Sequence, residues 1–273
     1  MDVSGAIRKE CERRGYSERT IETYQDCVRK FLSYCGKGVG FIGKKDVIDF
    51  LNNLKERGCS GSTLNVYHMA IRFFLEDILD KKIKLNIKYS RRPERLPRVL
   101  SKEEVKLLIG KIHNWKHKLM IELLYGSGMR SSELLNVRIC DLHINEGYGF
   151  VRQGKGNKDR MFILPKIVSE KVINLIEIEK LSNNDFLFLT NRREQYSARS
   201  LQEIVKKSAE KCGFKEVHCH TFRHSFATHL IEQGQSVSEV QSLLGHKSPE
   251  TTFVYLHTAA PNMIKVKSPL DNL

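Results

Sequence analysis

Two short stretches near the C-terminal end of the chain gather side chains that could act on a phosphate group. The first, HTFRHSFATHL, places His220 three residues before Arg223, which is about one helical turn. The second, LGHKSPETTFVYLH, places Tyr255 after His246. A histidine can transfer a proton, an arginine can bind phosphate oxygens and a tyrosine can act as a nucleophile. Phosphate chemistry is therefore one interpretation, beside a metal site and simple packing.

The spacing of these residues tests the other two interpretations. A zinc site would draw its ligands from one group of side chains, namely Cys212, Cys219, His220 and His224. Their spacing matches no paired Cys/His pattern, and the glutamate of an HExxH motif is missing. The sequence therefore predicts no metal and no cofactor. Histidines that pack at helix ends remain an alternative for His218, His224 and His229, and packing remains the common role of a single tyrosine.

A further candidate lies upstream, in the stretch YGSGMRSSELLNV. Gly126 and Gly128 bracket a predicted tight turn, and Arg130 precedes a helical pattern that begins at Ser131. An arginine at a helix start, beside backbone N–H groups that no carbonyl of the helix takes up, is well placed to bind a phosphate. A surface ion pair with Glu133 is an equally supported alternative.

Lys155 lies in a predicted hairpin turn, GKGNKDR. A glycine on each side lets the backbone approach a ligand closely, and the tip of a hairpin can reach into a DNA groove. A solvated turn lysine is the alternative. The stretch is not a nucleotide-binding loop, because the Gly-x4-Gly-Lys-Ser/Thr spacing is missing.

The elements that must position these residues are mostly helices. Residues 1–87 carry apolar stripes at helical spacing, and Ser101 with Glu104 forms a predicted capping box that opens a new helical block. Between 139 and 165 the pattern changes to short β-rich runs separated by turns, which predicts a three-stranded antiparallel meander. Helices dominate again from about 166. The predicted fold class is mainly α with a small antiparallel β-sheet (α+β).

The charge balance favours a nucleic-acid partner. The 273 residues include 46 Lys and Arg but only 32 Asp and Glu, which gives a net charge of +14. The segment 88–98 combines five basic residues with two prolines, which predicts an extended basic linker. Residues predicted to contact a DNA backbone are Lys44, Lys45, Arg72, Arg91, Arg92, Lys158 and Arg160.

Cysteine usage and hydropathy indicate a cytoplasmic protein. The seven cysteines are odd in number and form no Cys-x-x-Cys pair, as expected for reduced thiols. No signal peptide and no stretch of about 18 apolar residues is present, so we expect no membrane span.

Taken together, four stretches resemble the motif boxes of the tyrosine recombinase family, also called the phage integrase family. They are SGMRSSELLNV, GKGNKDR, HTFRHSFATHLIEQG and LGHKSPETTFVYLH, in this order. The family pattern of catalytic residues falls here on Arg130, Lys155, His220, Arg223, His246 and Tyr255. The departures are mild, with serine at 127 where threonine is common and phenylalanine at 222 where leucine is common. The chain also resembles the Xer-type members, including the archaeal sort that acts without a second paralogue.

The resemblance implies a role for each of these residues. Tyr255 would attack a DNA phosphodiester, with His220 as general base and Lys155 as general acid for the departing 5′-hydroxyl. Arg130 and Arg223 would clamp the phosphate, and His246 would donate a further hydrogen bond. Support around these groups is expected from Glu133, His224 and Gly245.

The resemblance also implies an architecture and an assembly. We expect a helical core-binding domain at 1–87, a linker at 88–98 and a catalytic domain at 99–273 whose tail exchanges between subunits. The expected partner is a double-stranded DNA recombination site. We expect a homotetramer when two such sites are paired, and a monomer or dimer in the absence of DNA. Chromosome or plasmid dimer resolution in chromosome segregation is the expected outcome. Alternatives are an integrase or excisionase of a mobile element, a type IB topoisomerase and a non-catalytic DNA-binding module.

Overall fold

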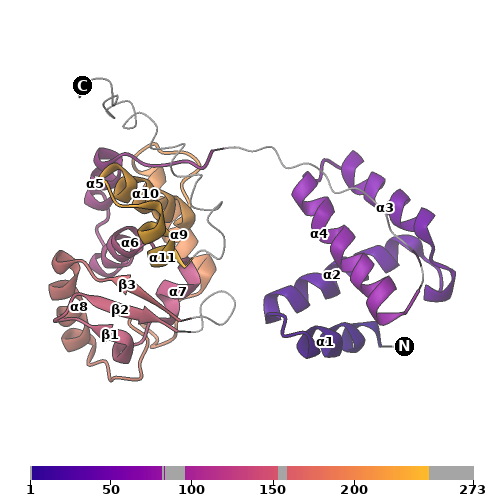
Figure 1. Cartoon of the computed structure of the whole chain (residues 1–273), viewed down its shortest axis with the longest axis horizontal. Helices are drawn as coiled ribbons and strands as arrows, with labels where there is room; N and C mark the ends of the chain where they lie inside the picture. Colours follow the sequence, from indigo (N-terminus) through magenta and orange to yellow (C-terminus); the bar gives the residue numbers. More distant parts are fainter. Residues whose placement is uncertain (1, 82, 84–95, 153–158, 246–273) are drawn as a thin grey trace, which may run out of the picture. The chain divides into compact units, whose positions relative to one another are not determined.

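The computed structural model describes residues 2–81, 83, 96–152 and 159–245. It divides the chain into two compact units, Met1–Glu94 and Arg95–Leu273 (Figure 1). The division lies within the segment 88–98 that the sequence predicts as a linker, of which only 96–98 are described. The predicted domain bounds themselves stay predictions.

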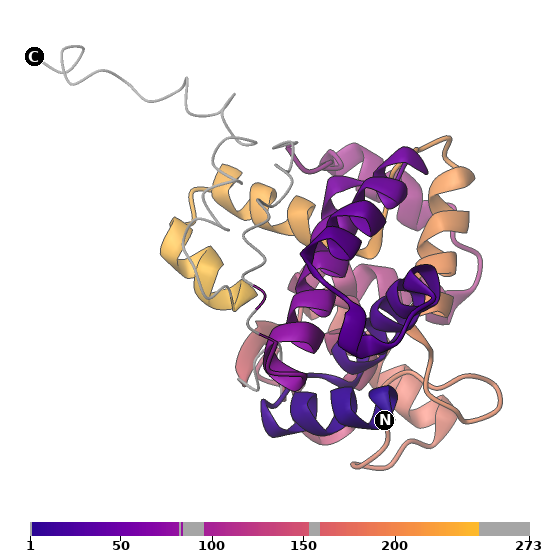
Figure 2. The ribbon, with the colours of Figure 1, turned by 90° about the vertical axis from the view of Figure 1, so that its right-hand side faces the viewer.

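The first unit is helical. Its elements are α1 (Val3–Arg13), α2 (Glu18–Cys35), η1 (Val39–Phe41), α3 (Lys44–Glu56), α4 (Gly61–Arg72) and η2 (Phe73–Ile78). Side chains of Asp2, Ser17 and Ser60 accept backbone N–H groups at the starts of α1, α2 and α4. Helices α2 and α4 lie side by side, as two views show (Figures 1 and 2). The apolar stripes close over a core that includes Phe31 and Phe74.

The second unit carries the remaining elements. Its helices are α5 (Lys102–Gly110), α6 (Trp115–Ser127), α7 (Ser131–Asn136), η3 (Ile139–Asp141), α8 (Lys166–Glu179), α9 (Ala198–Glu210), α10 (Cys219–Glu232) and α11 (Val237–Leu244). The predicted capping box is confirmed: Ser101 Oγ accepts the Glu104 N–H, and the Glu104 carboxylate accepts the Ser101 N–H. Helix α6 is buried along most of its length and packs against α10 and α8.

A small sheet completes the second unit. Strands β1 (Leu142–His143), β2 (Tyr148–Val151) and β3 (Arg160–Ile163) form an antiparallel meander in the order β1-β2-β3. In this register Arg160 pairs with Val151 and Phe162 with Gly149. The predicted fold class, mainly α with a small antiparallel sheet, is confirmed.

The predicted turn before Arg130 has a different form in the structure. Gly126 lies within α6 and contributes no turn, because the helix continues to Ser127. Gly128 alone makes the turn, as a left-handed cap with φ of 62°. A Cβ on Gly126 would lie 2.6 Å from Pro165, so close packing accounts for that glycine.

Candidate functional site

Arg130 occupies the N-cap of α7, directly after the turn that ends α6. Its backbone N–H donates to Glu133 Oε2 at 2.8 Å, and its Nη1 donates to Glu133 Oε1 at 2.5 Å. The alternative of a surface pair with Glu133 is wrong in one respect, since the Glu133 side chain is only 4% exposed. The carboxylate therefore fixes the Arg130 guanidinium at the start of the helix.

Glu133 gathers arginines from three different elements. Besides Arg130, it accepts from Arg160 Nη2 of β3 at 2.6 Å, and Arg223 Nη1 of α10 lies 3.9 Å away. Burial acts to raise the pKa of Glu133, but the hydrogen bonds and charges of Arg160 and Arg130 outweigh it and lower the pKa. Glu133 is thus held as an anion, and its charge draws the three guanidinium groups together.

Arg223 lies on the buried side of α10. Phe222 and Ala227 on the same helix are fully buried, and the whole Arg223 residue is 3% exposed. Its Nη1 donates to the Gly128 carbonyl at 2.6 Å, and its Nη2 donates to the Leu244 carbonyl at 2.5 Å. The guanidinium thus links the end of α6 to the end of α11.

His220 lies one turn before Arg223 on α10, and although much of its surface is exposed, neighbouring atoms displace part of the water around its ring. This partial loss of solvent, together with the nearby positive charges of Arg223 and Arg130, lowers the pKa of His220. The ring of His224 lies 6.4 Å from it, between centroids, and burial lowers the pKa of His224 to about 4. Both rings are therefore predominantly neutral at pH 7, and a neutral imidazole can accept a proton.

The described residues bring together three of the six predicted catalytic residues: Arg130, His220 and Arg223. The others, Lys155, His246 and Tyr255, lie outside the described residues. Elements that flank them in the sequence are described: β3 begins five residues after Lys155, and α11 ends two residues before His246. Gly245 caps α11 in the left-handed region, and a Cβ there would lie 2.7 Å from Arg160 Cδ.

The predicted DNA-contacting residues have different surroundings. Lys44 and Lys45 are exposed at the first turn of α3, and Arg72 is exposed at the end of α4 with an ion pair to Glu76 at 2.7 Å. Arg91, Arg92 and Lys158 lie outside the described residues. The Arg160 side chain is only 8% exposed, which disfavours the predicted DNA contact.

A sequence signal for the position of Arg160 did exist. Along β3, Phe162 is buried while Met161 and Ile163 are exposed, and Arg160 shares the parity of Phe162. An arginine on the inward face of a strand needs a buried acid, and Glu133 supplies it.

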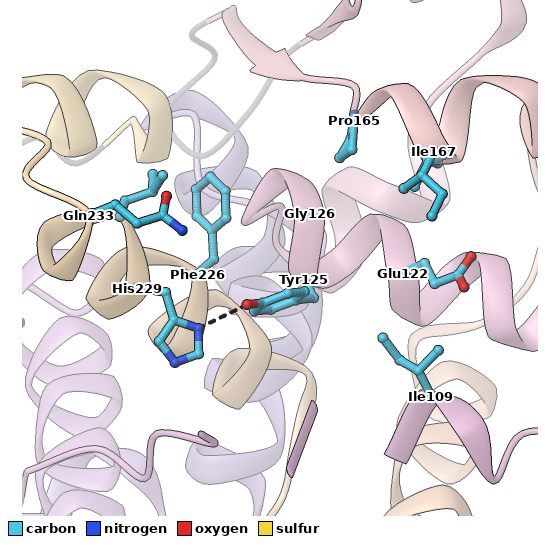
Figure 3. Close-up of a pocket in the computed structure, with 11 residues that line it drawn as sticks. Ile109, Glu122, Tyr125, Gly126, Pro165, Ile167, Phe226, His229 and Gln233 are labelled. Carbon is cyan, nitrogen blue, oxygen red and sulfur yellow. Dashed lines mark hydrogen bonds between the residues drawn. The ribbon is translucent and has the colours of Figure 1, made fainter. Parts of the chain in front are cut away.

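An apolar groove, absent from the predictions, lies between α6, α8 and α10 on this unit. Its volume is about 510 Å³, and Tyr125, Pro165, Ile167 and Phe226 are among its lining residues (Figure 3). On one wall the Tyr125 hydroxyl and His229 Nδ1 share a hydrogen bond of 2.9 Å. That bond pairs two polar groups of a mostly apolar lining, in which Glu122 and Gln233 are the other polar side chains.

Among the described residues, no group of three His, Cys, Asp or Glu side chains is arranged to hold a metal ion. None of the described helices combines the length and apolar character that crossing a membrane requires.

Comparison with known proteins covers most of the chain. The pattern of the Phage integrase family matches residues 98–261, and that of the phage integrase N-terminal SAM-like domain matches residues 5–85. A tyrosine recombinase of Thermosipho africanus is 36% identical over 262 residues, covering 90% of this chain and 91% of the relative. Tyrosine recombinase XerA of Thermococcus kodakarensis is 33% identical over 259 residues, covering 93% of this chain and 89% of the relative. A solved structure of XerH site-specific recombinase bound to palindromic difH substrate, a post-cleavage complex, matches with a TM-score of 0.77 and 26% identity, covering 95% of this chain and 82% of that one.

Proposed function

Since this chain belongs to the phage integrase family, as a tyrosine recombinase of the Xer type, we propose that it breaks and rejoins DNA at a defined site through a 3′-phosphotyrosine intermediate. The observation that carries this proposal is the gathering of Arg130 and Arg223 at the Glu133 carboxylate, with His220 one helical turn before Arg223. Two arginines beside a neutral histidine suit a reaction in which negative charge grows on a phosphate.

The proposed cleavage step uses each residue once. The Tyr255 oxygen bonds to phosphorus while His220 takes the phenol proton, and the bond from phosphorus to the 5′-oxygen breaks. Lys155 donates a proton to that oxygen. Arg130 and Arg223, with a hydrogen bond from His246, neutralise the charge on the non-bridging oxygens. The lowered pKa of His220 supports its role as base, because the ring is ready to accept a proton at neutral pH.

The proposed reaction uses neither a metal ion nor ATP. Arginine side chains supply the positive charge that the transition state needs, and the phosphotyrosine ester keeps the energy of the broken phosphodiester. The 5′-hydroxyl of a partner strand can then attack this ester and reverse the chemistry. Two such rounds exchange four strands through a Holliday junction.

We propose dimer resolution of a chromosome or plasmid as the biological outcome. Relatives that carry the name XerA or XerD support it over integration or excision of a mobile element. The substrate would be duplex DNA in the cytoplasm, and the free state of all seven cysteines fits that compartment. A plasmid dimer with two candidate sites should yield monomers; relaxation of a supercoil without exchange would favour the topoisomerase alternative.

The active assembly would be a homotetramer on two paired sites. We propose that the tail after Tyr255 binds the next subunit, in the apolar groove beside α6, α8 and α10 (Figure 3). The apolar residues Met263, Ile264 and Val266 fit such a lining. A 1–257 truncation should bind a single site but fail to pair two sites, and normal pairing by that truncation would contradict the role of the tail.

Covalent trapping tests the cleavage chemistry directly. A duplex with a candidate site, nicked near the cleavage point so that the 5′-hydroxyl fragment escapes, is incubated with protein in EDTA and run on a denaturing gel. A shifted band that Tyr255→Phe abolishes is expected. If the wild-type protein binds DNA well but no candidate sequence yields a covalent product, the non-catalytic alternative gains support.

A further inference from the structure

Arg160 is a buried arginine with two kinds of partner. It is the first residue of β3, and its side chain is 8% exposed. Its Nη2 donates to Glu133 Oε2 at 2.6 Å, while its Nη1 donates to the carbonyl of Leu243 in the last turn of α11. One guanidinium therefore joins α7, β3 and α11.

The end of α11 is held by two arginines in succession. Arg160 binds the carbonyl of Leu243, and Arg223 binds the carbonyl of Leu244 at 2.5 Å. These carbonyls belong to the last turn, where intrahelical donors run out. Gly245 follows in the left-handed region, and its missing Cβ leaves the space that the Arg160 side chain occupies.

Arg160 also has a particular place along the chain. Lys155 precedes β3 by five residues in the sequence, and α11 ends shortly before His246 and the segment of Tyr255. Glu133, the acid that Arg160 binds, also binds Arg130. Through Glu133, Arg160 is thus linked to Arg130 and Arg223, and through the Leu243 carbonyl it holds the helix end that precedes His246 and Tyr255 in the sequence.

We propose that Arg160 is a positioning residue for strand cleavage and makes no contact with the DNA phosphate. It fixes the strand behind Lys155 against the helix end before His246 and Tyr255, with the Glu133 carboxylate as the common anchor. This inference rests on the proposed function. Arginine suits the task because its planar guanidinium can donate to a carboxylate and a carbonyl at the same time in a fixed geometry. A lysine ammonium can also donate to both, but its flexible side chain does not fix the geometry.

The test compares Arg160→Met and Arg160→Lys with a matched control, Arg138→Met. Arg138 is an exposed arginine of the same unit, with its guanidinium 4.3 Å from the Phe186 ring centroid. Binding to a cleavable site is measured by mobility shift. The single-turnover rate of covalent trapping is measured at saturating protein, and amide hydrogen exchange is followed over residues 240–245 in the DNA-free proteins.

For Arg160→Met we expect a fall of ~10- to 100-fold in the trapping rate, with site affinity within about three-fold of wild type, because small misplacements of reacting groups cost rate and leave binding intact. Arg160→Lys should recover part of the rate. Exchange at 240–245 should be faster in Arg160→Met and unchanged in Arg138→Met.

Several results would overturn the inference. One is an Arg160→Met protein that binds the DNA site more weakly but traps at the wild-type rate when protein is saturating. This result would indicate that Arg160 contacts DNA. Another is unchanged exchange at 240–245. If neither Arg160 variant unfolds cooperatively, the residue is purely structural. Absence of trapping by the wild-type protein would count against the proposed function, and the exchange data would still decide the role of Arg160 at the end of α11.

Discussion

The arrangement of the arginines in the site depends on one residue, Glu133, through its carboxylate. A buried carboxylate is costly unless it is paired, and here Arg130 and Arg160 both donate to it. In the proposed reaction, the same pairing would keep the arginines ordered before a phosphate binds. Preorganised charge of this kind contributes to catalysis because it needs no rearrangement during the reaction.

Glu133→Gln should therefore destabilise the second unit strongly. Loss of the anion leaves buried guanidinium groups without their counter-charge, and we expect a fall of about 3–5 kcal/mol in the free energy of unfolding. The single tryptophan, Trp115, lies on α6 of this unit, so its fluorescence in urea reports the change. Glu210→Gln, which removes an exposed partner of Lys206, should leave the transition unchanged; equal effects of the two variants would contradict the anchoring role.

His224 should make the second unit sensitive to acid. Its folded-state pKa of about 4 lies below the ordinary value near 6.5, so the unfolded chain binds more protons between these pH values. The contribution to stability is full above about pH 6.5 and is lost as the pH falls toward 4. In His224→Gln, the loss of unfolding free energy across this pH window should be smaller than in wild type by about 2–3 kcal/mol.

Urea titrations at a series of pH values, followed by Trp115 fluorescence, measure this dependence. His113→Gln, which changes an exposed histidine of the same unit, serves as the control. A His224→Gln protein with the same slope as wild type would show that burial of this ring does not control the acid response.

At the scale of elements, the junction between α6 and α7 sets the position of Arg130. Gly128 ends α6 with a φ of 62°, and its carbonyl accepts from Arg223 Nη1. A Cβ at this glycine would lie 2.4 Å from the Phe226 ring and 3.0 Å from Leu244. The turn therefore requires glycine for its backbone and for close approach of α10 and α11.

Gly128→Ala should cost about 2–4 kcal/mol, the sum of left-handed strain and overpacking, and should also reduce DNA cleavage. Gly213→Ala is the matched control, because its φ is 72° but nothing lies within 4 Å of the added Cβ. That variant should lose only about 1 kcal/mol. Urea unfolding and covalent trapping measure both effects, and equal losses would show that strain alone matters.

At the scale of the molecule, each unit has its own hydrophobic core. The first unit buries Ile7, Val28, Phe31, Ile71 and Phe74 among its helices, and the hydrophobic cluster that contains them is made of residues of the first unit. A domain with a separate core can fold by itself.

A protein of residues 1–94 should therefore be helical and unfold cooperatively in isolation. Circular dichroism during a thermal scan measures this, with the full chain as reference. It should also bind duplex DNA weakly, with an affinity that falls as salt rises, since exposed Lys44 and Lys45 are available to phosphates. A non-cooperative transition would show that the first unit needs the second.

The sequence by itself determined the helical blocks, the three-stranded meander and the family. Period, capping residues and turn residues act over a few neighbours, so Ser101 with Glu104 was enough to place the start of α5, and short β-rich runs between turn residues were enough to predict the sheet. The motif boxes likewise selected Arg130, His220 and Arg223 as candidate site residues without knowledge of their distances.

Only the tertiary structure decided how the charges pair. Glu133, Arg160 and Arg223 are far apart in sequence, and their contacts depend on the packing of α7, β3 and α10. A charged residue in a basic stretch is as compatible with DNA contact as with burial, and this is why the sequence predicted a DNA contact for Arg160, whose side chain is only 8% exposed in the structure. The groove beside Tyr125 and His229 is also tertiary, because it needs three helices to converge. Local pattern fixes elements, while long-range packing fixes which side chains meet.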